Sequence, residues 1–298
     1  MSVIAWIGLG HMGAPMALHL VQAGHTVKGF DVVPVLSQAL VKDGLQAAAS
    51  IAEAVKDADV VFTMVQTSEQ VHDLCLQPEG IFAHVKPGVI YVDASSIDIA
   101  MTTSLHEAAK SRGIAMLDAP VSGGVGGAKA ATLTVMVGGD LAVFNAVKPI
   151  FQTYGKNIVH AGGAGLGQAA KICNNLILGV TMVGVCEGFM LAEKLGLNSK
   201  TFFDISSVSS GQCWSMTSYC PAPNILPNVP SSHDYEPGFM AKMMLKDLNL
   251  AKHAADYVHA MTPMSDEALN LYQQYTDAGN AEKDFSGIIT WLANLKAE

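Results

Sequence analysis

The residues best suited to acid–base chemistry lie in one short segment near the middle of the chain. Lys171, Asn174 and Asn175 stand at positions i, i+3 and i+4, so a helix would carry them on one face. A lysine relays a proton when desolvation and a neighbouring cation lower its pKa toward the working pH, and an asparagine holds a hydroxyl group without titrating. An isolated lysine is usually a solvated surface charge. The glycines before this segment and the apolar run after it favour a site, with Lys171 as the general acid/base.

A glycine pattern near the amino terminus predicts a dinucleotide-binding turn. Gly8, Gly10 and Gly13 follow an apolar, strand-like segment and precede a helix-like one. The first glycine permits a tight bend, the second lets pyrophosphate approach the backbone, and the third lets the helix pack on the strand. Asp31 closes the next predicted strand, where a carboxylate hydrogen-bonds ribose hydroxyls and repels the extra phosphate of NADP. The pattern therefore predicts NAD, the alternative being a structural turn with an ordinary carboxylate at a strand end.

Two further segments could contact a ligand. After a predicted strand that ends at Asp118, Ser122 offers a hydroxyl group, and Gly123 and Gly124 could turn their N–H groups toward an anion such as a substrate carboxylate. The alternative is a glycine-rich loop that only turns the chain. The second segment is 239–248, where Lys246 and Asp247 interrupt an apolar run. Such charges are stable there if they face a ligand cleft or are paired, and an internal ion pair or a solvated helix face is the alternative.

The elements that must position these residues change character along the chain. Short apolar runs alternate with amphipathic stretches in the first half, the pattern of βαβ units in a parallel sheet covered on both faces. We predict an α/β fold: an amino-terminal Rossmann-type doubly wound sheet (residues 1–163), then an all-α carboxy-terminal domain (164–298), joined by a long helix over about 167–195. The proline-rich segment 206–238 should be a long ordered loop. The predicted strands are 3–7, 26–30, 60–64, 89–93, 115–118, 132–138 and 158–160, and the predicted helices are 15–23, 50–56, 68–76, 100–111, 239–255 and 264–278.

Composition excludes several classes of protein. Of 298 residues, 14% are charged and the formal net charge is -9, which argues against binding to a nucleic-acid backbone. No uninterrupted apolar stretch of about 18 residues and no charged leader is visible, so we expect a soluble cytoplasmic protein, or a mitochondrial one only if a transit peptide has been removed. The five cysteines lack the spacing of a zinc or redox site, so we expect free thiols and no metal.

Four ordered motifs resemble the β-hydroxyacid dehydrogenase family, and in particular its hydroxyisobutyrate branch: 8–13, 118–124, 165–175 and 246–248. Segment 209–214 also favours that branch. The resemblance implies that Lys171 is the catalytic acid/base, and it implies two sets of binding residues. The substrate set is Ser122, Gly123, Gly124, Asn174, Asn175, Trp214 and Lys246. The cofactor set is Gly8, Leu9, Gly10, His11, Met12, Gly13, Asp31, Met64, Val65, Ser96, Phe239, Lys246 and Asp247.

The sequence departs from the family pattern at two places. Met64-Val65-Gln66 stands where many relatives have Met-Leu-Pro, and His11 stands where asparagine is frequent. The implied reaction is oxidation of 3-hydroxyisobutyrate to methylmalonate semialdehyde in valine breakdown, with hydride passing to NAD. The alternatives are a dehydrogenase of L-serine, glycerate or methylserine, a tartronate semialdehyde reductase, and a non-catalytic NAD-binding module. A homodimer or homotetramer is expected.

Overall fold

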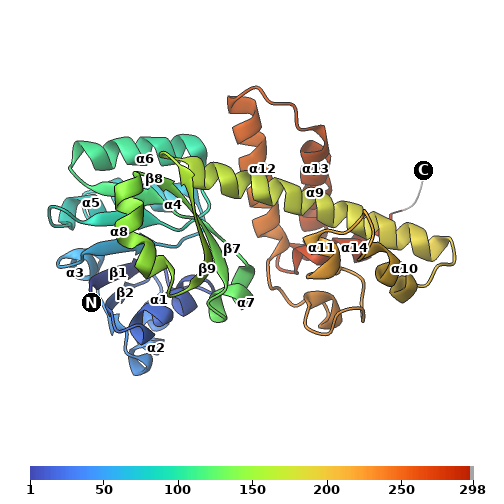
Figure 1. Ribbon diagram of the computed structural model, residues 1–298, viewed down its shortest axis with the longest axis horizontal. Helices are drawn as coiled ribbons and strands as arrows, with labels where there is room; N and C mark the ends of the chain where they lie inside the picture. Colours follow the sequence, from blue (N-terminus) through green and yellow to red (C-terminus); the bar gives the residue numbers. More distant parts are fainter. Residues whose placement is uncertain (296–298) are drawn as a thin grey trace. The chain divides into compact units, whose positions relative to one another are not determined.

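The computed structural model describes residues 1–295, which divide into two compact units: Met1–Lys171, and a second that begins at Ile172. The first unit is built on one nine-stranded sheet (Figure 1). Its strand order is β3-β2-β1-β4-β5-β6-β8-β7, with β9 beside β8. The strands are β1 (Val3–Ile7), β2 (Thr26–Phe30), β3 (Gln46–Ala47), β4 (Val60–Thr63), β5 (Ile90–Asp93), β6 (Ala115–Asp118), β7 (Val121–Ser122), β8 (Leu133–Gly139) and β9 (Gly155–Gly162).

The parallel part of this sheet has the Rossmann strand order. From β3 to β6 every neighbouring pair is parallel, in the order 3-2-1-4-5-6. β6 and β7 each pair with β8 in the antiparallel sense, and β9 pairs with β8 in the parallel sense. The carboxyl ends of β1, β4, β5 and β6 therefore lie along one sheet edge, where open α/β sheets bind ligands. The predicted Rossmann fold class is confirmed.

Helices cover both faces of the sheet because its strands are apolar on both sides. Ile4 and Trp6 of β1 pack into one core, and Ala5 and Ile7 pack into the other. The first core includes residues of α1 (Gly13–Gln22), α7 (Gly124–Lys129) and α8 (Leu141–Phe151). The second includes residues of α3 (Ile51–Val55), α4 (Ser68–Leu76), α5 (Ile81–His84) and α6 (Ile99–Ser111). The short α2 (Pro34–Ala39) follows β2.

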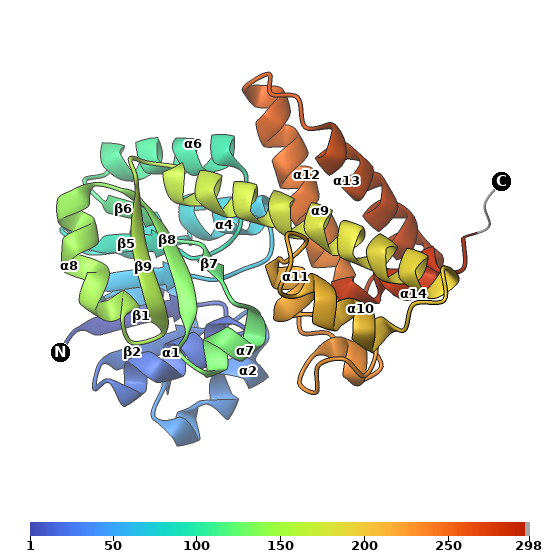
Figure 2. The same ribbon diagram turned by 45° about the vertical axis from the view of Figure 1, so that its right-hand side comes forward.

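The regular elements described in the second unit are all helical, as expected. They are α9 (Leu166–Lys194), which begins in the first unit, and α10 (Ser199–Ser206), α11 (Trp214–Thr217), α12 (Ala241–Tyr257), α13 (Pro263–Tyr275), α14 (Ile288–Leu292) and short 3-10 and π turns. Figure 2 shows α12 and α13 side by side. Gly179 of α9 allows close packing, since a Cβ there would lie 2.9 Å from the Leu248 side chain. The linking helix is thus confirmed, and its length is 29 residues.

The structure differs from the sequence-based prediction mainly in short elements. Segment 206–238 is largely irregular, as predicted, but it contains α11 and a 3-10 turn at Pro230–Ser232. The glycine-rich segment after β6, for which no helix or strand was predicted, forms β7 and α7, with Gly123 at φ 135° between them. Helices α2, α5, α8, α10 and α14 and strand β3 were not predicted. The physical reason for α7 is tertiary contact: Ala128 is buried, and the His19 ring contacts its carbonyl oxygen at 3.0 Å.

Candidate active site

The glycine turn after β1 has the geometry that a dinucleotide needs. Gly8 adopts φ +96°, and a Cβ there would lie 2.3 Å from the Met64 carbonyl oxygen. A Cβ on Gly13 would lie 2.0 Å from the Gly8 carbonyl oxygen, so only glycine allows α1 to start this close to the turn. Gly10 is exposed and has open space around its Cα, where a phosphate could approach. Beneath the turn, the buried Trp6 indole donates a hydrogen bond to the Gly8 carbonyl oxygen at 3.0 Å.

The start of α1 suits a phosphate group. No side chain caps it and no acidic residue lies in its first turn. The Ala14 amide is bonded to the Gly10 carbonyl oxygen, so it is the positive dipole end of the helix that can attract an anion. His11 is exposed and Met12 is half-buried beside this helix start. These features, with the open Cα of Gly10, fit the pyrophosphate of a dinucleotide.

The Asp31 carboxylate is held beside the turn. Its Oδ2 accepts a hydrogen bond from the Leu9 amide at 2.7 Å, and its Oδ1 accepts one from the Val33 amide at 2.8 Å. The Leu9 side chain is buried in the core, so Leu9 meets the site through its backbone alone. A groove lined in part by Gly8, Asp31 and Val65 runs beside the carboxylate. An adenosine ribose placed there would meet a fixed negative charge.

The loops that follow β4 and β5 are joined to each other. The Val65 amide donates a hydrogen bond to the Ser95 hydroxyl oxygen at 3.0 Å. Met64 and Ser96, which adjoin Val65 and Ser95 in the chain, are half-buried. Ser95 thus links two residues that were assigned to the cofactor: Val65, which it binds, and Ser96, which follows it in the chain. Ser95 itself was not predicted as a site residue.

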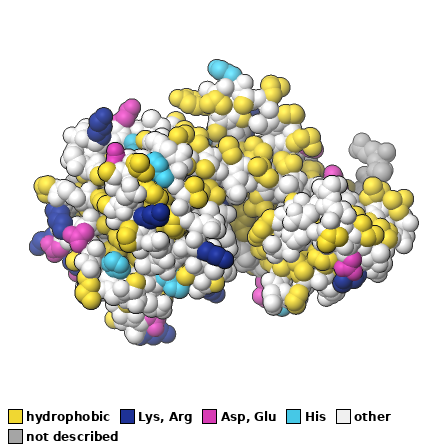
Figure 3. All heavy atoms as spheres, in the orientation of Figure 1, with side chains coloured by type: hydrophobic (Ala, Val, Ile, Leu, Met, Phe, Trp, Pro, Cys, Tyr) yellow, Lys and Arg dark blue, Asp and Glu magenta, His cyan; other side chains and the backbone are white. Residues whose placement is uncertain are grey.

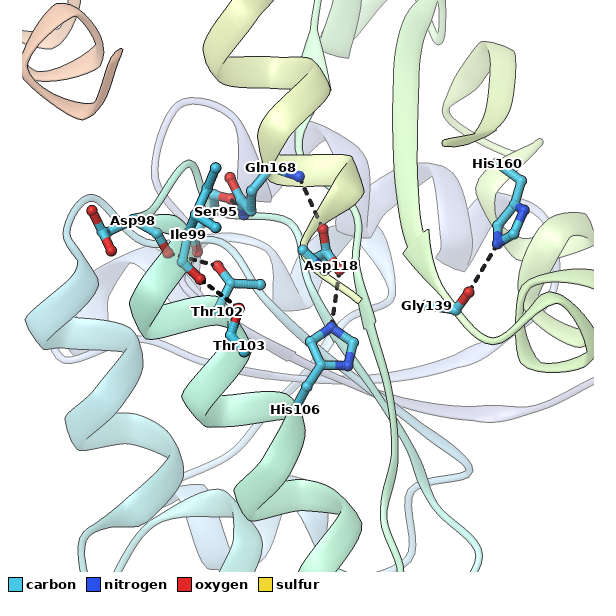
Figure 4. Close-up of polar contacts among 11 residues, drawn as sticks. Ser95, Asp98, Ile99, Thr102, Thr103, His106, Asp118, Gly139, His160 and Gln168 are labelled. Carbon is cyan, nitrogen blue, oxygen red and sulfur yellow. Dashed lines mark hydrogen bonds and ion pairs between the residues drawn. The ribbon is translucent and has the colours of Figure 1, made fainter. Parts of the chain in front are cut away.

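The start of α9 is anchored by a carboxylate that the sequence reasoning did not assign. Asp118, the last residue of β6, accepts hydrogen bonds from the Gly165 and Gln168 amides, both at 2.9 Å (Figure 4). Lys171 lies one turn further along the helix and is only 9% exposed. A lysine ammonium group is rarely buried to this extent without a function or a partner. The sequence features that could have indicated this contact were an aspartate at the end of a predicted strand and glycines at the start of the long helix.

The amide and acidic residues assigned to the second unit form one hydrogen-bonded group. The Asn175 side chain donates to Asp247 Oδ2 at 2.5 Å and accepts from the Asn174 side chain at 2.9 Å. The Lys246 ammonium nitrogen lies 3.3 Å from Asp247 Oδ1. Asn175 and Asp247 are 2% and 5% exposed. Lys246 and Asp247 are therefore an ion pair, and that pair fixes the Asn175 amide on the face of α9 that also carries Lys171.

A buried carboxylate supports the aromatic residues assigned to the second unit. Asp284 Oδ2 accepts hydrogen bonds from the Tyr219 hydroxyl at 2.8 Å and from the Phe239 amide at 2.9 Å. The Trp214 ring stacks on Tyr219 at a centroid distance of 4.9 Å, and half of Trp214 remains exposed. Burial raises the pKa of Asp284. Asp284 was not recognised from the sequence, because its partners are distant along the chain.

The titratable residues do not gather as metal ligands. Within residues 1–295, no three His, Cys, Asp or Glu side chains lie together in a way that could hold a metal ion. The cysteines are free thiols.

This fold and this glycine turn define a nicotinamide-dependent dehydrogenase. Residues 3–163 match the NAD binding domain of 6-phosphogluconate dehydrogenase, and residues 165–292 match the domain described as NAD-binding of NADP-dependent 3-hydroxyisobutyrate dehydrogenase. An NAD-dependent L-serine dehydrogenase of Pseudomonas aeruginosa is 46% identical over 96% of each chain, and a 3-hydroxyisobutyrate dehydrogenase of the same organism is 41% identical over 97% of each.

A solved structure gives the same result. The Mycobacterium tuberculosis 3-hydroxyisobutyrate dehydrogenase with L-serine is 42% identical, covers 98% of this chain and 99% of its own, and superposes with a TM-score of 0.92. The chain belongs to the 3-hydroxyisobutyrate dehydrogenase family. It is an NAD-dependent oxidoreductase that acts on a small molecule, which confirms the resemblance drawn from the four motifs.

Proposed function

We propose that this chain oxidises the primary alcohol of 3-hydroxyisobutyrate to methylmalonate semialdehyde in valine breakdown. The observation that carries the proposal is the buried Lys171 at the start of α9, in a chain related over nearly its whole length to 3-hydroxyisobutyrate dehydrogenases. NAD, when bound, supplies the acceptor for the hydride that leaves the carbinol carbon. Lys171 takes the proton of the hydroxyl group. Ser122, Gly123 and Gly124 bind the carboxylate.

The remaining residues have positioning roles in this proposal. Asn175 holds the substrate at an angle fixed by Asp247, while Asn174, Lys246 and Trp214 complete the substrate contacts. Phe239, Met64, Val65 and Ser96 contact the cofactor. Asp31 selects NAD over NADP, because its fixed carboxylate would repel a 2′-phosphate.

The test of the proposed role is replacement of Lys171 by alanine. Turnover should fall by about 10²–10⁴-fold, the usual contribution of a positioned acid/base, while the dissociation constant of NAD changes little. The matched control is Lys194→Ala, which removes an exposed lysine from the last turn of the same helix. If Lys171→Ala retained nearly full turnover, the proposed acid/base role would be wrong.

A second candidate substrate is L-serine. Two observations favour it: the relative named L-serine dehydrogenase at 46% identity, and the solved structure of the Mycobacterium tuberculosis 3-hydroxyisobutyrate dehydrogenase with L-serine. The two molecules share a carboxylate and a primary alcohol and differ at the α carbon, where a methyl group replaces an amino group. Initial rates with 3-hydroxyisobutyrate, L-serine and glycerate, each with NAD and NADP, decide between them. A higher kcat/KM for L-serine would make it the substrate.

We also propose how the protein is organised. The functional boundary lies between residues 163 and 164, and the protein is soluble, cytoplasmic and a homodimer or homotetramer. α9 is long and apolar enough to cross a membrane by length and composition, and 44% of its most apolar window is buried within the protein. Its exposed apolar residues Ile177 and Leu191 lie two heptads apart on one face, which a second copy could cover. Figure 3 shows hydrophobic side chains at many places on the second unit.

A further inference from the structure

Gln168 is a fully buried polar residue that the proposed reaction does not use. It lies in the first turn of α9, and both ends of its side-chain amide are bonded to one loop, the segment after β5. Its Nε2 donates to the Ser95 carbonyl oxygen at 2.6 Å, and its Oε1 accepts from the Ile97 amide at 3.2 Å. These two bonds flank Ser96, which is assigned to the cofactor. Gln168 therefore ties the start of α9 to a cofactor loop.

The backbone of the same helix turn is held by Asp118. This carboxylate accepts from the Gly165 and Gln168 amides and also from the His106 ring, whose Nε2 lies 2.9 Å from Oδ1. Asp118 is fully buried, and it satisfies amide groups that a helix start would otherwise leave unpaired. Figure 4 shows His106 and Gln168 reaching Asp118 from opposite sides. A negative charge here also complements the helix dipole.

The backbone packing at this point leaves little freedom. A Cβ on Gly167 would lie 2.5 Å from the Asp118 carbonyl oxygen and 2.6 Å from that of Met136. A Cβ on Gly138 would lie 2.6 Å from the Gly167 nitrogen. The first turn of α9 thus rests directly on the backbone of β6 and β8, and its position is set by main-chain contact as well as by hydrogen bonds.

The network continues to the second cofactor loop. The Ser95 hydroxyl accepts from the Val65 amide at 3.0 Å, and the Ser95 amide donates to Asp93 Oδ1 at 3.1 Å. A continuous set of hydrogen bonds therefore runs from the loop after β4, through the loop after β5 and Gln168, to Asp118. We call Ser95, His106, Asp118 and Gln168 the α9 clamp.

We infer that the α9 clamp sets the position of the Lys171 ammonium group relative to the cofactor loops, and that Gln168 is its central positioning residue. This inference rests on the proposed acid/base role of Lys171. Lys171 follows Gln168 by three residues, about 4.5 Å along the helix axis, so its Cα moves with that turn. A shift of about 1 Å in a reacting group costs up to about 10²-fold in rate. Loosening the clamp should therefore lower turnover through Lys171.

The test is a double-mutant cycle in the full chain. Gln168→Met keeps the length and helix preference of the side chain but removes both of its hydrogen bonds. We expect kcat to fall by about 10- to 100-fold with a much smaller change in the KM for the hydroxyacid. In the Lys171→Ala background, the same substitution should have an effect of less than about 2-fold, because the residue through which it acts is gone.

A second pair of variants covers the case in which Gln168→Met does not fold, as judged by circular dichroism. His106→Phe removes the ring donor to Asp118, and His106→Gln keeps a donor near the same place. The phenylalanine variant should lose several-fold in kcat, the glutamine variant should recover most of it, and the loss should again vanish in the Lys171→Ala background. The matched control is His160→Phe. The His160 ring bonds the Gly139 carbonyl oxygen at 2.9 Å rather than Asp118 (Figure 4), and its loss should leave kcat unchanged.

The outcomes are distinct. If Lys171→Ala lowers kcat but the Gln168 or His106 effect is absent, or is equally large without Lys171, the clamp has no positioning role and the inference is overturned. If Lys171→Ala retains full turnover, the proposed acid/base role fails first and the inference fails with it.

Discussion

Asp93 should make the folded protein less stable as pH rises, which is the opposite of the usual effect of an aspartate. It ends β5, is fully buried, and accepts hydrogen bonds at Oδ1 from the Thr63 hydroxyl and the Ser95 amide. Its Oδ2 has no hydrogen-bond partner among the residues that the structure describes. Burial raises the pKa of Asp93 from 3.8 to about 6. The folded state therefore binds this proton more tightly than the unfolded state does.

The sign and the size of the effect follow from proton linkage. Between about pH 4 and pH 6 the folded chain holds the Asp93 proton and the unfolded chain does not, so stability from this group is lost as pH rises through that window. A difference of about two pKa units corresponds to a change of about 3 kcal/mol in the free energy of unfolding. Asp93→Asn keeps the size of the side chain and removes the titration. The variant should therefore gain about 2–3 kcal/mol relative to the parent between pH 4 and pH 7.

Urea unfolding followed by tryptophan fluorescence at pH 4, 5, 6 and 7 measures this difference. The control is Asp43→Asn, an exposed carboxylate for which the difference should stay flat. A flat difference for Asp93→Asn as well would show that the carboxyl group titrates normally in the folded protein, and the burial argument would be wrong.

Three further changes test the cofactor turn and the second unit. Asp31→Asn should lower the preference for NAD over NADP, measured as the ratio of kcat/KM values, by about 10-fold or more, since a charged hydrogen bond contributes about 1.5–3 kcal/mol. An unchanged ratio would show that Asp31 does not select between the two cofactors. Gly13→Ala should destabilise the protein by about 1–3 kcal/mol and weaken NAD binding in titration calorimetry, because its Cβ would meet the Gly8 carbonyl oxygen. Asp284→Ala should lower the midpoint of thermal unfolding by several degrees, since buried donors including the Ser286 hydroxyl lose their acceptor. An unchanged midpoint would show that the Asp284 hydrogen bonds do not stabilise the second unit.

The long apolar strands were predictable, and the short glycine-rich elements were not. β1 has the predicted bounds, because a strand buried on both faces is a continuous apolar run, and β2 also has the predicted bounds. α7 has the sequence GVGGAK, which has little intrinsic preference for a helix. It forms because Ala128 is buried under α1, a contact that no local pattern reveals.

The same distinction holds for the site. The turn at Gly8 and Gly13 was predictable because the backbone geometry itself demands glycine there. The α9 clamp was not, since the hydrogen bonds that tie α9 to Asp118 and Ser95 join residues 47 to 73 positions apart along the chain. The position of a buried glutamine in the sequence does not indicate which residues its side chain will bind. Its function becomes visible only when strand ends and a helix start are brought to one place.

One continuous helix carries Lys171, the last residue of the first unit, and Asn175. Each residue added between them would rotate one side chain by about 100° relative to the other. Deletions act in the same way, and the shortest insertion that restores the phase to within about 20° is about seven residues, at a length increase of about 10 Å. Chimaeras that combine halves of different homologues should therefore be spliced ahead of residue 163 or after residue 194, leaving this helix from a single parent.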